Sequence, residues 1–312
     1  MSTSISVVIV SDYRPSEDKE IEYLASCVEA LAHQTFEGPV DHILVASAPL
    51  SEATVSSLLA ILPSLRIEVL PGGSSPEMKV HGAHGSVGEV VAFIDADCIP
   101  APGWLDAISA TLRECPSAAA VSGSTIYAQM DLFARVHCLI GRGIMEEARR
   151  LPTQRLSNHN FAIRRACLDS IAVPPGLSPF SGSYYAKKLR DAGFVIVFDP
   201  AARTVHAYEG WDAECDIRRN NGHAFFNNRF IFPDLRLRYG WVARLRYLGL
   251  PIYYFGRILQ TWIVCLSRFK SFGVAWYELP FALGLAPVSM WYELAGAVTA
   301  VRGKQLADTA YR

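Results

Sequence analysis

The stretch Val90–Leu105, with the sequence VVAFIDADCIPAPGWL, constrains the fold of this chain more than any other. It begins with a continuous apolar run over Val90–Ile94, which is typical of a strand buried on both faces of a sheet. Two prolines and Gly103 then predict a turn, and Trp104 begins an amphipathic helix. A strand covered on both faces needs helices on both sides of its sheet, so this stretch favours an α/β fold.

Two carboxylates, Asp95 and Asp97, stand at the expected carboxyl end of this strand. Residues at i and i+2 of an extended chain face the same side, and unpaired carboxylates are costly to bury. A divalent cation would make such a pair tolerable, and oxygen ligands suit Mg²⁺ or Mn²⁺. An ion held in this way can clamp a diphosphate. The competing interpretation is an acidic pair that caps the next helix.

Strand and helix patterns alternate along the front part of the chain. Short apolar runs rich in β-branched residues predict strands, and apolar residues at helical spacing predict helices between them. The alternation favours an α/β domain with a mostly parallel sheet, whose ligands bind at the carboxyl ends of the strands. The expected strands are 5–10, 40–45, 66–70, 90–95, 119–123 and 193–200, the expected helices are 20–33, 53–62, a short one within 80–88, and 126–150, and the expected loop is 71–76.

The D-A-D pair followed by P-x-P-x-W-L resembles the Asp-X-Asp element of glycosyltransferase family 2, whose members use nucleotide sugars and have the GT-A fold. Other segments over roughly residues 4–210 also resemble motifs of this family, including those around Lys79, Asn160 and His206. The resemblance implies a GT-A domain over residues 1–235, with a Rossmann-like central sheet flanked by helices.

The resemblance also implies roles for single residues. Asp95 and Asp97 would hold Mg²⁺ or Mn²⁺, and His206 would either join the metal and diphosphate or be structural. Lys79 would contact a diphosphate or be a solvated loop lysine, and Asn160 would bind the transferred sugar or order its loop. His159, beside it, is expected to be structural. The residues expected to bind the nucleotide sugar are Ser11, Asp12, Tyr13, Lys79, Asp95 and Asn160.

Two departures from the family pattern bear on function. Residues 45–49 read VASAP where the family has V-D-D-G-S, so the nucleotide cannot be inferred by analogy. The family's E-D pair, which supplies the catalytic base, falls on Ser181 and Gly182, and neither can act as a base at neutral pH. Either another group acts as the base, the metal-bound geometry suffices without one, or the chain no longer transfers sugar and is a catalytically silent binding or scaffolding protein. The candidates for a displaced base are Glu209 and Asp212, with Glu146 or Glu147 as further choices. The segment of Glu209 to Asp212 and the following Arg218, Arg219 and His223 mixes acidic, aromatic and basic residues, as expected near an acceptor and pyrophosphate or in a solvated polar loop.

The last part of the chain, residues 236–312, has a different character. Residues 203–312 carry 14 Lys and Arg against 8 Asp and Glu, whereas residues 1–202 carry 15 against 22. Arginines alternate with aromatic residues, and the apolar stretches 248–266 and 281–301 each approach the ~20 residues that span a bilayer. We expect amphipathic helices on an anionic membrane surface. The alternatives are a helical hairpin within the membrane, and a helical subdomain or dimer interface.

These patterns together predict where the protein works and what it does. Seven scattered cysteines and the lack of a signal-peptide pattern favour the cytoplasm, at the inner face of the cell membrane. We expect a metal-dependent, inverting transfer from a nucleotide sugar to a lipid-linked or saccharide acceptor in cell-surface polysaccharide synthesis. No nucleic-acid module is recognised. The G-x-G-x-R signature of nucleotidyltransferases is absent as well, which argues against that class of enzyme.

Overall fold

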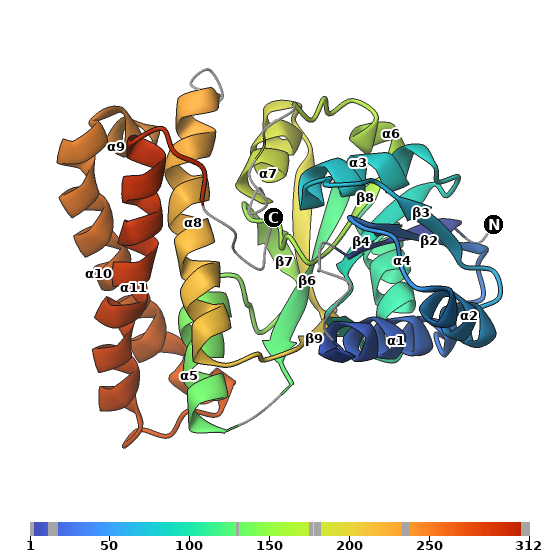
Figure 1. The fold of residues 1–312 in the computed structure, drawn as a ribbon, viewed down its shortest axis with the longest axis horizontal. Coiled ribbons are helices and arrows are strands. Elements are labelled where there is room, and N and C mark those ends of the chain that lie inside the picture. Colours follow the sequence, from blue (N-terminus) through green and yellow to red (C-terminus); the bar gives the residue numbers. More distant parts are fainter. Residues whose placement is uncertain are drawn as a thin grey trace.

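The computed structural model of the chain describes residues 3–11, 18–128, 131–174, 177, 182–232 and 237–306. These residues form a nine-stranded sheet with helices on both faces, and a layer of further helices beside it (Figure 1). The predicted α/β class is therefore confirmed. Asp12, Tyr13 and Ser181, which the sequence singles out, lie outside the described residues.

The sheet has the strand order β3-β2-β1-β4-β8-β6-β9-β5, and β7 pairs with β9. Strands β1 to β4 run parallel to one another, β8 lies antiparallel between β4 and β6, and β6 is parallel to β9. The carboxyl ends of β4 and β9 and the start of β8 therefore lie near one edge. The strands are β1 (Ile5–Ser11), β2 (Val40–Ala46), β3 (Arg66–Val69), β4 (Val90–Asp95), β5 (Cys98–Pro100), β6 (Ala118–Tyr127), β7 (Leu151–Thr153), β8 (Asn160–Arg164) and β9 (Val195–His206).

Several of the predicted element boundaries are wrong, among them those of the short helix within 80–88, which is α3 (Ser75–His84), and of the strand 193–200, which is β9 (Val195–His206). The expected helix over 126–150 is shorter, because β6 continues to Tyr127 along β9 and the Asp131 side chain caps a helix that ends at Arg142. The expected loop over 71–76 ends early, because Ser74 and Glu77 form a capping box that starts a helix at Ser75. The helices are α1 (Asp18–Ala32), α2 (Glu52–Ile61), α3 (Ser75–His84), α4 (Trp104–Glu114), α5 (Leu132–Arg142), α6 (Arg165–Leu168), α7 (Gly182–Asp191), α8 (Trp211–Ile231), α9 (Gly240–Arg244), α10 (Gly249–Arg268) and α11 (Leu279–Val301), with 3₁₀ turns at Arg246–Leu248 and Phe269–Phe272.

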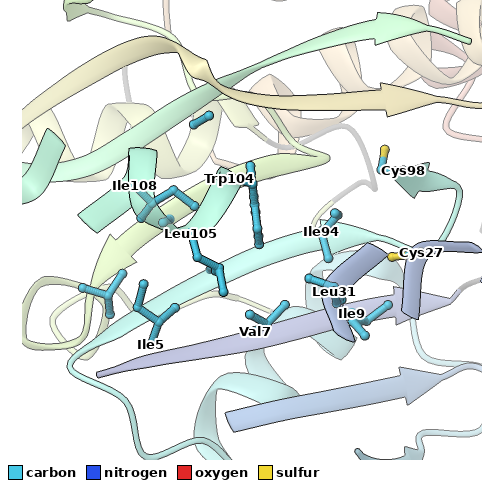
Figure 2. Close-up of a cluster of buried hydrophobic side chains, with 14 of the residues drawn as sticks. Ile5, Val7, Ile9, Cys27, Leu31, Ile94, Cys98, Trp104, Leu105 and Ile108 are labelled. Carbon is cyan, nitrogen blue, oxygen red and sulfur yellow. The ribbon is translucent and has the colours of Figure 1, made fainter. Parts of the chain in front are cut away.

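Strand β1 shows why its apolar run is continuous. Ile5, Val7 and Ile9 face one side of the sheet and pack with side chains of α1 and α4, among them Leu31 and Trp104 (Figure 2). Val8 and Val10 face the other side, where they join the core that includes α3 and α7. A strand covered on both faces needs apolar residues at most positions, so the alternation of a half-exposed strand is missing here.

The helical layer lies beside β6 and β9, and its helices share two apolar cores. Helix α11 lies between α8 and α10, and α10 forms the outer edge of the layer (Figure 1). Because α8 packs along α11, the layer includes residues before 236, where the sequence analysis places the start of the C-terminal extension. The division into 1–235 and 236–312 stays a prediction.

Candidate functional site

Asp95 ends β4 and is held by two basic side chains. Its Oδ1 accepts a hydrogen bond from Lys79 Nζ at 2.9 Å, and its Oδ2 lies 3.0 Å from Nδ1 of His159. Burial would raise the pKa of Asp95, but Lys79 and His159 outweigh it and hold that pKa below its usual value. Asp95 is therefore an ionised carboxylate at neutral pH.

His159 links Asp95 to the helical layer. Its Nε2 contacts a guanidinium nitrogen of Arg142 at the end of α5. An arginine can only donate hydrogen bonds, so Nε2 must accept and Nδ1 must carry the proton that faces Asp95. Burial, together with Arg142, lowers the pKa of His159 to about 4, which agrees with a neutral ring. The expected structural role for His159 thus includes fixing the orientation of a site carboxylate.

Asp97 and His206 form the second part of the site. Strand β5 pairs antiparallel with the end of β9, which brings His206 beside Cys98 and its neighbour Asp97. Nε2 of His206 lies 3.0 Å from Oδ2 of Asp97, and its Nδ1 lies 2.6 Å from the carbonyl oxygen of Ala207. Burial would lower the pKa of His206, but the charge of Asp97 outweighs it and raises that pKa.

The pair fits a hard divalent cation. Adjacent ligands of an octahedral Mg²⁺ with bonds of ~2.1 Å lie ~3.0 Å apart, and Asp97 and His206 show this spacing. A metal-binding histidine usually donates its other N–H to a backbone carbonyl, as Nδ1 of His206 can to Ala207. Cys98 lies within the same group of possible ligands, but burial and Asp97 raise the pKa of its thiol well above the ordinary value. Mg²⁺ and Mn²⁺ prefer oxygen and nitrogen donors to a thiol, so Asp97 and His206 are the better ligands for such an ion.

A cavity of about 260 Å³ joins these residues. Its sheet-side wall includes Asp95, Asp97, His159 and His206. Asp95 is the last residue of β4, and Asp97 lies beyond the end of that strand. Its other wall comes from α5, α8 and α10. The side chains that line it from these helices or just beyond α5 include Arg142, Glu146, Ile217, Arg218, Asn221 and Arg257.

Three other residues that are expected to bind the donor, Lys79, Asn160 and Ser11, lie outside the described lining of the cavity. Lys79 is buried rather than solvated, and its Nζ bonds Ser75 as well as Asp95. Asn160 is fully buried, and its side chain bonds Trp104 and the carbonyl oxygens of Ser124 and Ala202. These contacts favour the second expected role of Asn160, which is to order the chain. Ser11 is buried at the end of β1.

Among the expected candidates for the catalytic base, Glu146 lines the cavity and Glu209 and Asp212 do not. Glu209 and Asp212 are exposed and lie outside the described lining of the cavity. Glu146 lines it, and its carboxylate accepts hydrogen bonds from Ser124 Oγ at 2.6 Å and from the backbone N–H of Thr125 at 2.9 Å. Burial raises the pKa of Glu146, although these hydrogen bonds oppose the rise.

Gly182, at the place of the family's usual carboxylate, also lines the cavity. A Cβ added there would overlap the carbonyl oxygen of Leu156, so the backbone leaves no room for any side chain at this position. Arg142 is a cavity residue that the sequence analysis did not single out, because it belongs to no motif. Arg218 belongs to the mixed segment after Glu209 that is expected near an acceptor and pyrophosphate or as a solvated polar loop, and it lines the cavity.

A parallel half-sheet whose edge carboxylates face a cavity, with a histidine from a later strand, is the architecture of a GT-A glycosyltransferase. A sequence family described as "Glycosyltransferase like family 2" matches residues 3–221. The chain therefore belongs to glycosyltransferase family 2 and is a glycosyltransferase. A search of curated proteins finds no significant match.

Solved structures support the same fold. The mannosyltransferase PcManGT from Pyrobaculum calidifontis, in complex with GDP-Man and Mn²⁺, is similar with a TM-score of 0.61 and 16% identity, over 98% of this chain and 89% of that one. GalNAc-T7, solved with UDP, GalNAc and Mn²⁺, has a TM-score of 0.52 and 15% identity, over 67% of this chain and 44% of that one. At these identities the likeness shows the fold alone.

Proposed function

We propose that this protein is a metal-dependent, inverting glycosyltransferase that moves a sugar from a nucleotide-sugar donor to a lipid-linked or saccharide acceptor. The observation that carries the proposal is the pair of Asp97 and His206, 3.0 Å apart in a cavity that also contains Asp95. Two similar structures were solved with nucleotides or nucleotide sugars and Mn²⁺, which supports the same donor class here.

Asp97 and His206 would hold Mg²⁺ or Mn²⁺, which would offset the negative charge of the departing nucleoside diphosphate. Asp95 keeps its charge through Lys79 and His159, and each of its oxygens retains a lone pair that can accept a hydroxyl of the donor. Ser11, Asp12 and Tyr13, expected from the family resemblance to line the nucleotide pocket, remain part of the proposal, as does Asn160.

Glu146 is the group that we assign as the general base. Inversion requires a base on the acceptor side that removes the proton of the attacking hydroxyl. Glu146 lines the cavity from the chain segment that follows α5, and Ser124 and Thr125 fix its carboxylate. Since its pKa is raised, its carboxylate is a stronger base than an exposed one would be. Glu209 and Asp212, the earlier candidates, would have to reach the cavity by a movement of the chain.

The C-terminal extension supports an association with the inner face of the membrane. Ile252, Phe255, Leu259, Ile263 and Leu266 are exposed at helical spacing along α10; we call this surface the α10 face. Exposed aromatic and basic residues lie before and after it in the chain, namely Arg238, Trp241, Arg244, Arg246, Tyr247, Lys270, Trp276 and Tyr277. This composition fits a helix that lies on anionic lipid.

Helix α11 differs from α10. It is the one helix among the described residues that is long and apolar enough to cross a membrane, by length and composition only. Much of its surface is buried against α8 and α10, however, so it also fits the core of the helical layer. We therefore propose that the protein binds the membrane surface through the α10 face rather than by a spanning helix.

The donor site is tested by isothermal titration of the full-length protein with UDP-, GDP-, dTDP- and CMP-sugars, with and without Mn²⁺. We expect one donor to bind only with the metal, and Asp97→Asn to weaken that binding by about tenfold or more. Asp106→Asn, an exposed carboxylate on α4, is the matched control and should bind like the wild type. The proposal fails if no donor binds, or if the Asp97 variant binds as the wild type does.

A further inference from the structure

Two guanidinium groups on the helical wall of the cavity are incompletely paired with anions. The Arg218 side chain on α8 is 3% exposed, its Nε has no hydrogen-bond partner among the described residues, and its ion pair with Glu214 is long at 3.4 Å. Arg142 contacts the neutral ring of His159 and lies 5.7 Å from the ring centre of Tyr127. Within the described part of the chain, no carboxylate lies at ion-pair distance from Arg142.

Burying a guanidinium is costly unless an anion pairs with it. The chain nevertheless makes room for Arg218. A Cβ added to Gly141 on α5 would lie 2.6 Å from Nη2 of Arg218, so a glycine is what allows the guanidinium to occupy this place. Arg142, Arg218 and Gly141 all line the cavity that contains Asp97. An anion that completes the pairing of Arg142 and Arg218 would therefore be part of a molecule that enters this cavity.

We propose that Arg142 and Arg218 bind a phosphate-class oxyanion carried by the acceptor. The identification of that molecule as the acceptor rests on the function proposed above, in which Asp97 and His206 serve the donor diphosphate. The two arginines belong to helices α5 and α8, and Arg142 reaches from α5 to His159 beside the end of β4. A tetrahedral phosphate offers oxygens to guanidiniums from two helices at once, whereas a carboxylate has only two.

Helix α10 gives this site a connection to the membrane surface. Arg257 of α10 lines the same cavity, but two bonds of 3.0 Å to Glu293 already satisfy its guanidinium, so it is not an anion ligand in this proposal. The α10 face lies on the exposed side of the same helix. An amphiphile with a phosphate head could therefore contact both the two arginines in the cavity and the α10 face. A soluble phosphate ester would contact the arginines only.

The test uses full-length protein in EDTA, so that the metal site does not contribute. The probe is sn-glycerol 1-phosphate, measured by isothermal titration, with glycerol as the neutral comparison. We expect Arg218→Gln to weaken binding of the phosphate by about tenfold or more, as for the loss of a hydrogen bond to a charged group. The matched control is Arg219→Gln, because Arg219 is the next residue of α8, is 40% exposed and pairs with Asp216. It should bind the phosphate like the wild type.

Gly141→Ala is a second variant for the case in which Arg218→Gln does not fold. It leaves Arg218 and Glu214 present but displaces the guanidinium, so it should weaken binding in the same direction. Thermal unfolding shows which variants are folded. Equal phosphate affinity in the wild type and in folded Arg218 or Gly141 variants overturns the proposal, as does an equal loss in Arg219→Gln.

Vesicles of phosphatidylcholine with and without phosphatidic acid distinguish the two sources of phosphate. If Arg218→Gln weakens binding to vesicles that contain phosphatidic acid, the acceptor is a lipid. If Arg218→Gln weakens binding of glycerol phosphate but not of these vesicles, the acceptor is a soluble phosphate ester. The donor panel with Mn²⁺ separates this inference from the proposed function. Arg218→Gln should bind the donor like the wild type. If the wild type binds the phosphate but no nucleotide sugar, the anion site is supported. Its assignment to an acceptor then fails together with the proposed function.

Discussion

Asn160→Ala tests whether the asparagine at the start of β8 orders the protein or contacts the donor. Its amide is fully buried at the meeting point of three elements. The side-chain oxygen accepts from Trp104 Nε1 of α4 at 2.9 Å, and Nδ2 donates to the carbonyl oxygens of Ser124 and Ala202, each at 2.8 Å. The amide does not line the cavity among the described residues.

The magnitude follows from these three hydrogen bonds. Alanine leaves one buried donor and two buried acceptors on the partners unsatisfied, at ~1–3 kcal/mol each. We therefore expect the free energy of unfolding to fall by about 3–9 kcal/mol, a large part of the ~5–15 kcal/mol of an ordinary domain. Affinity for the donor, measured on the folded fraction, should stay within about twofold of the wild type.

Urea unfolding followed by tryptophan fluorescence measures the stability, and titration with the donor measures the affinity. Asn221→Ala is the matched control, because Asn221 is a half-buried asparagine in the cavity wall, and it should cost ~1 kcal/mol or less. The reasoning is refuted if Asn160→Ala unfolds at the wild-type urea concentration and has lost affinity for the donor. Asn160 would then contact the sugar, which is the other role that the family resemblance implies.

Three further predictions concern other parts of the molecule. Glu146→Gln should abolish sugar transfer while metal-dependent donor binding persists, and an active variant would exclude Glu146 as the base. The pKa of Glu214 falls from 4.5 to about 2, because His137 and Arg218 outweigh its burial. Its stabilisation, on the order of 3 kcal/mol, is therefore present above about pH 4.5 and lost as the pH falls toward 2. Acid unfolding of Glu214→Gln should show a weaker pH dependence over that window. Phe255→Ser should reduce co-sedimentation with anionic vesicles and leave donor affinity unchanged, whereas undiminished sedimentation would exclude the α10 face as the membrane contact.

The sequence predicts the fold best where a local pattern and the tertiary surroundings agree. The run Val90–Ile94 is apolar because both faces of β4 are covered, so the pattern directly reports the burial. The helix expected over 126–150 is wrong for the opposite reason. Residues up to Tyr127 extend β6 only because β9 lies beside them, and a partner distant in the chain leaves no local signal.

The candidate site shows the same limit. Asp95 and Asp97 are visible in the sequence because two adjoining carboxylates after a buried strand have few structural explanations. Their contact with His206 depends on β5, a strand of three residues that is too short to show any periodicity. Arg218 stands in a mixed acidic, aromatic and basic segment that the sequence places near an acceptor or in a solvated loop, but its burial depends on the missing side chain of Gly141 on α5, which no local pattern shows.

The close approach of Gly182 to the carbonyl oxygen of Leu156 limits how this enzyme could be redesigned. An engineer who wished to reinstate the usual family carboxylate at residue 182 could not do so by one substitution, because the main chain at Leu156 occupies the required volume. The segment around Leu156 would have to be rebuilt first. If Glu146 is the base, as proposed, rate improvements are better sought there, because its carboxylate already has both its space and its hydrogen-bond donors.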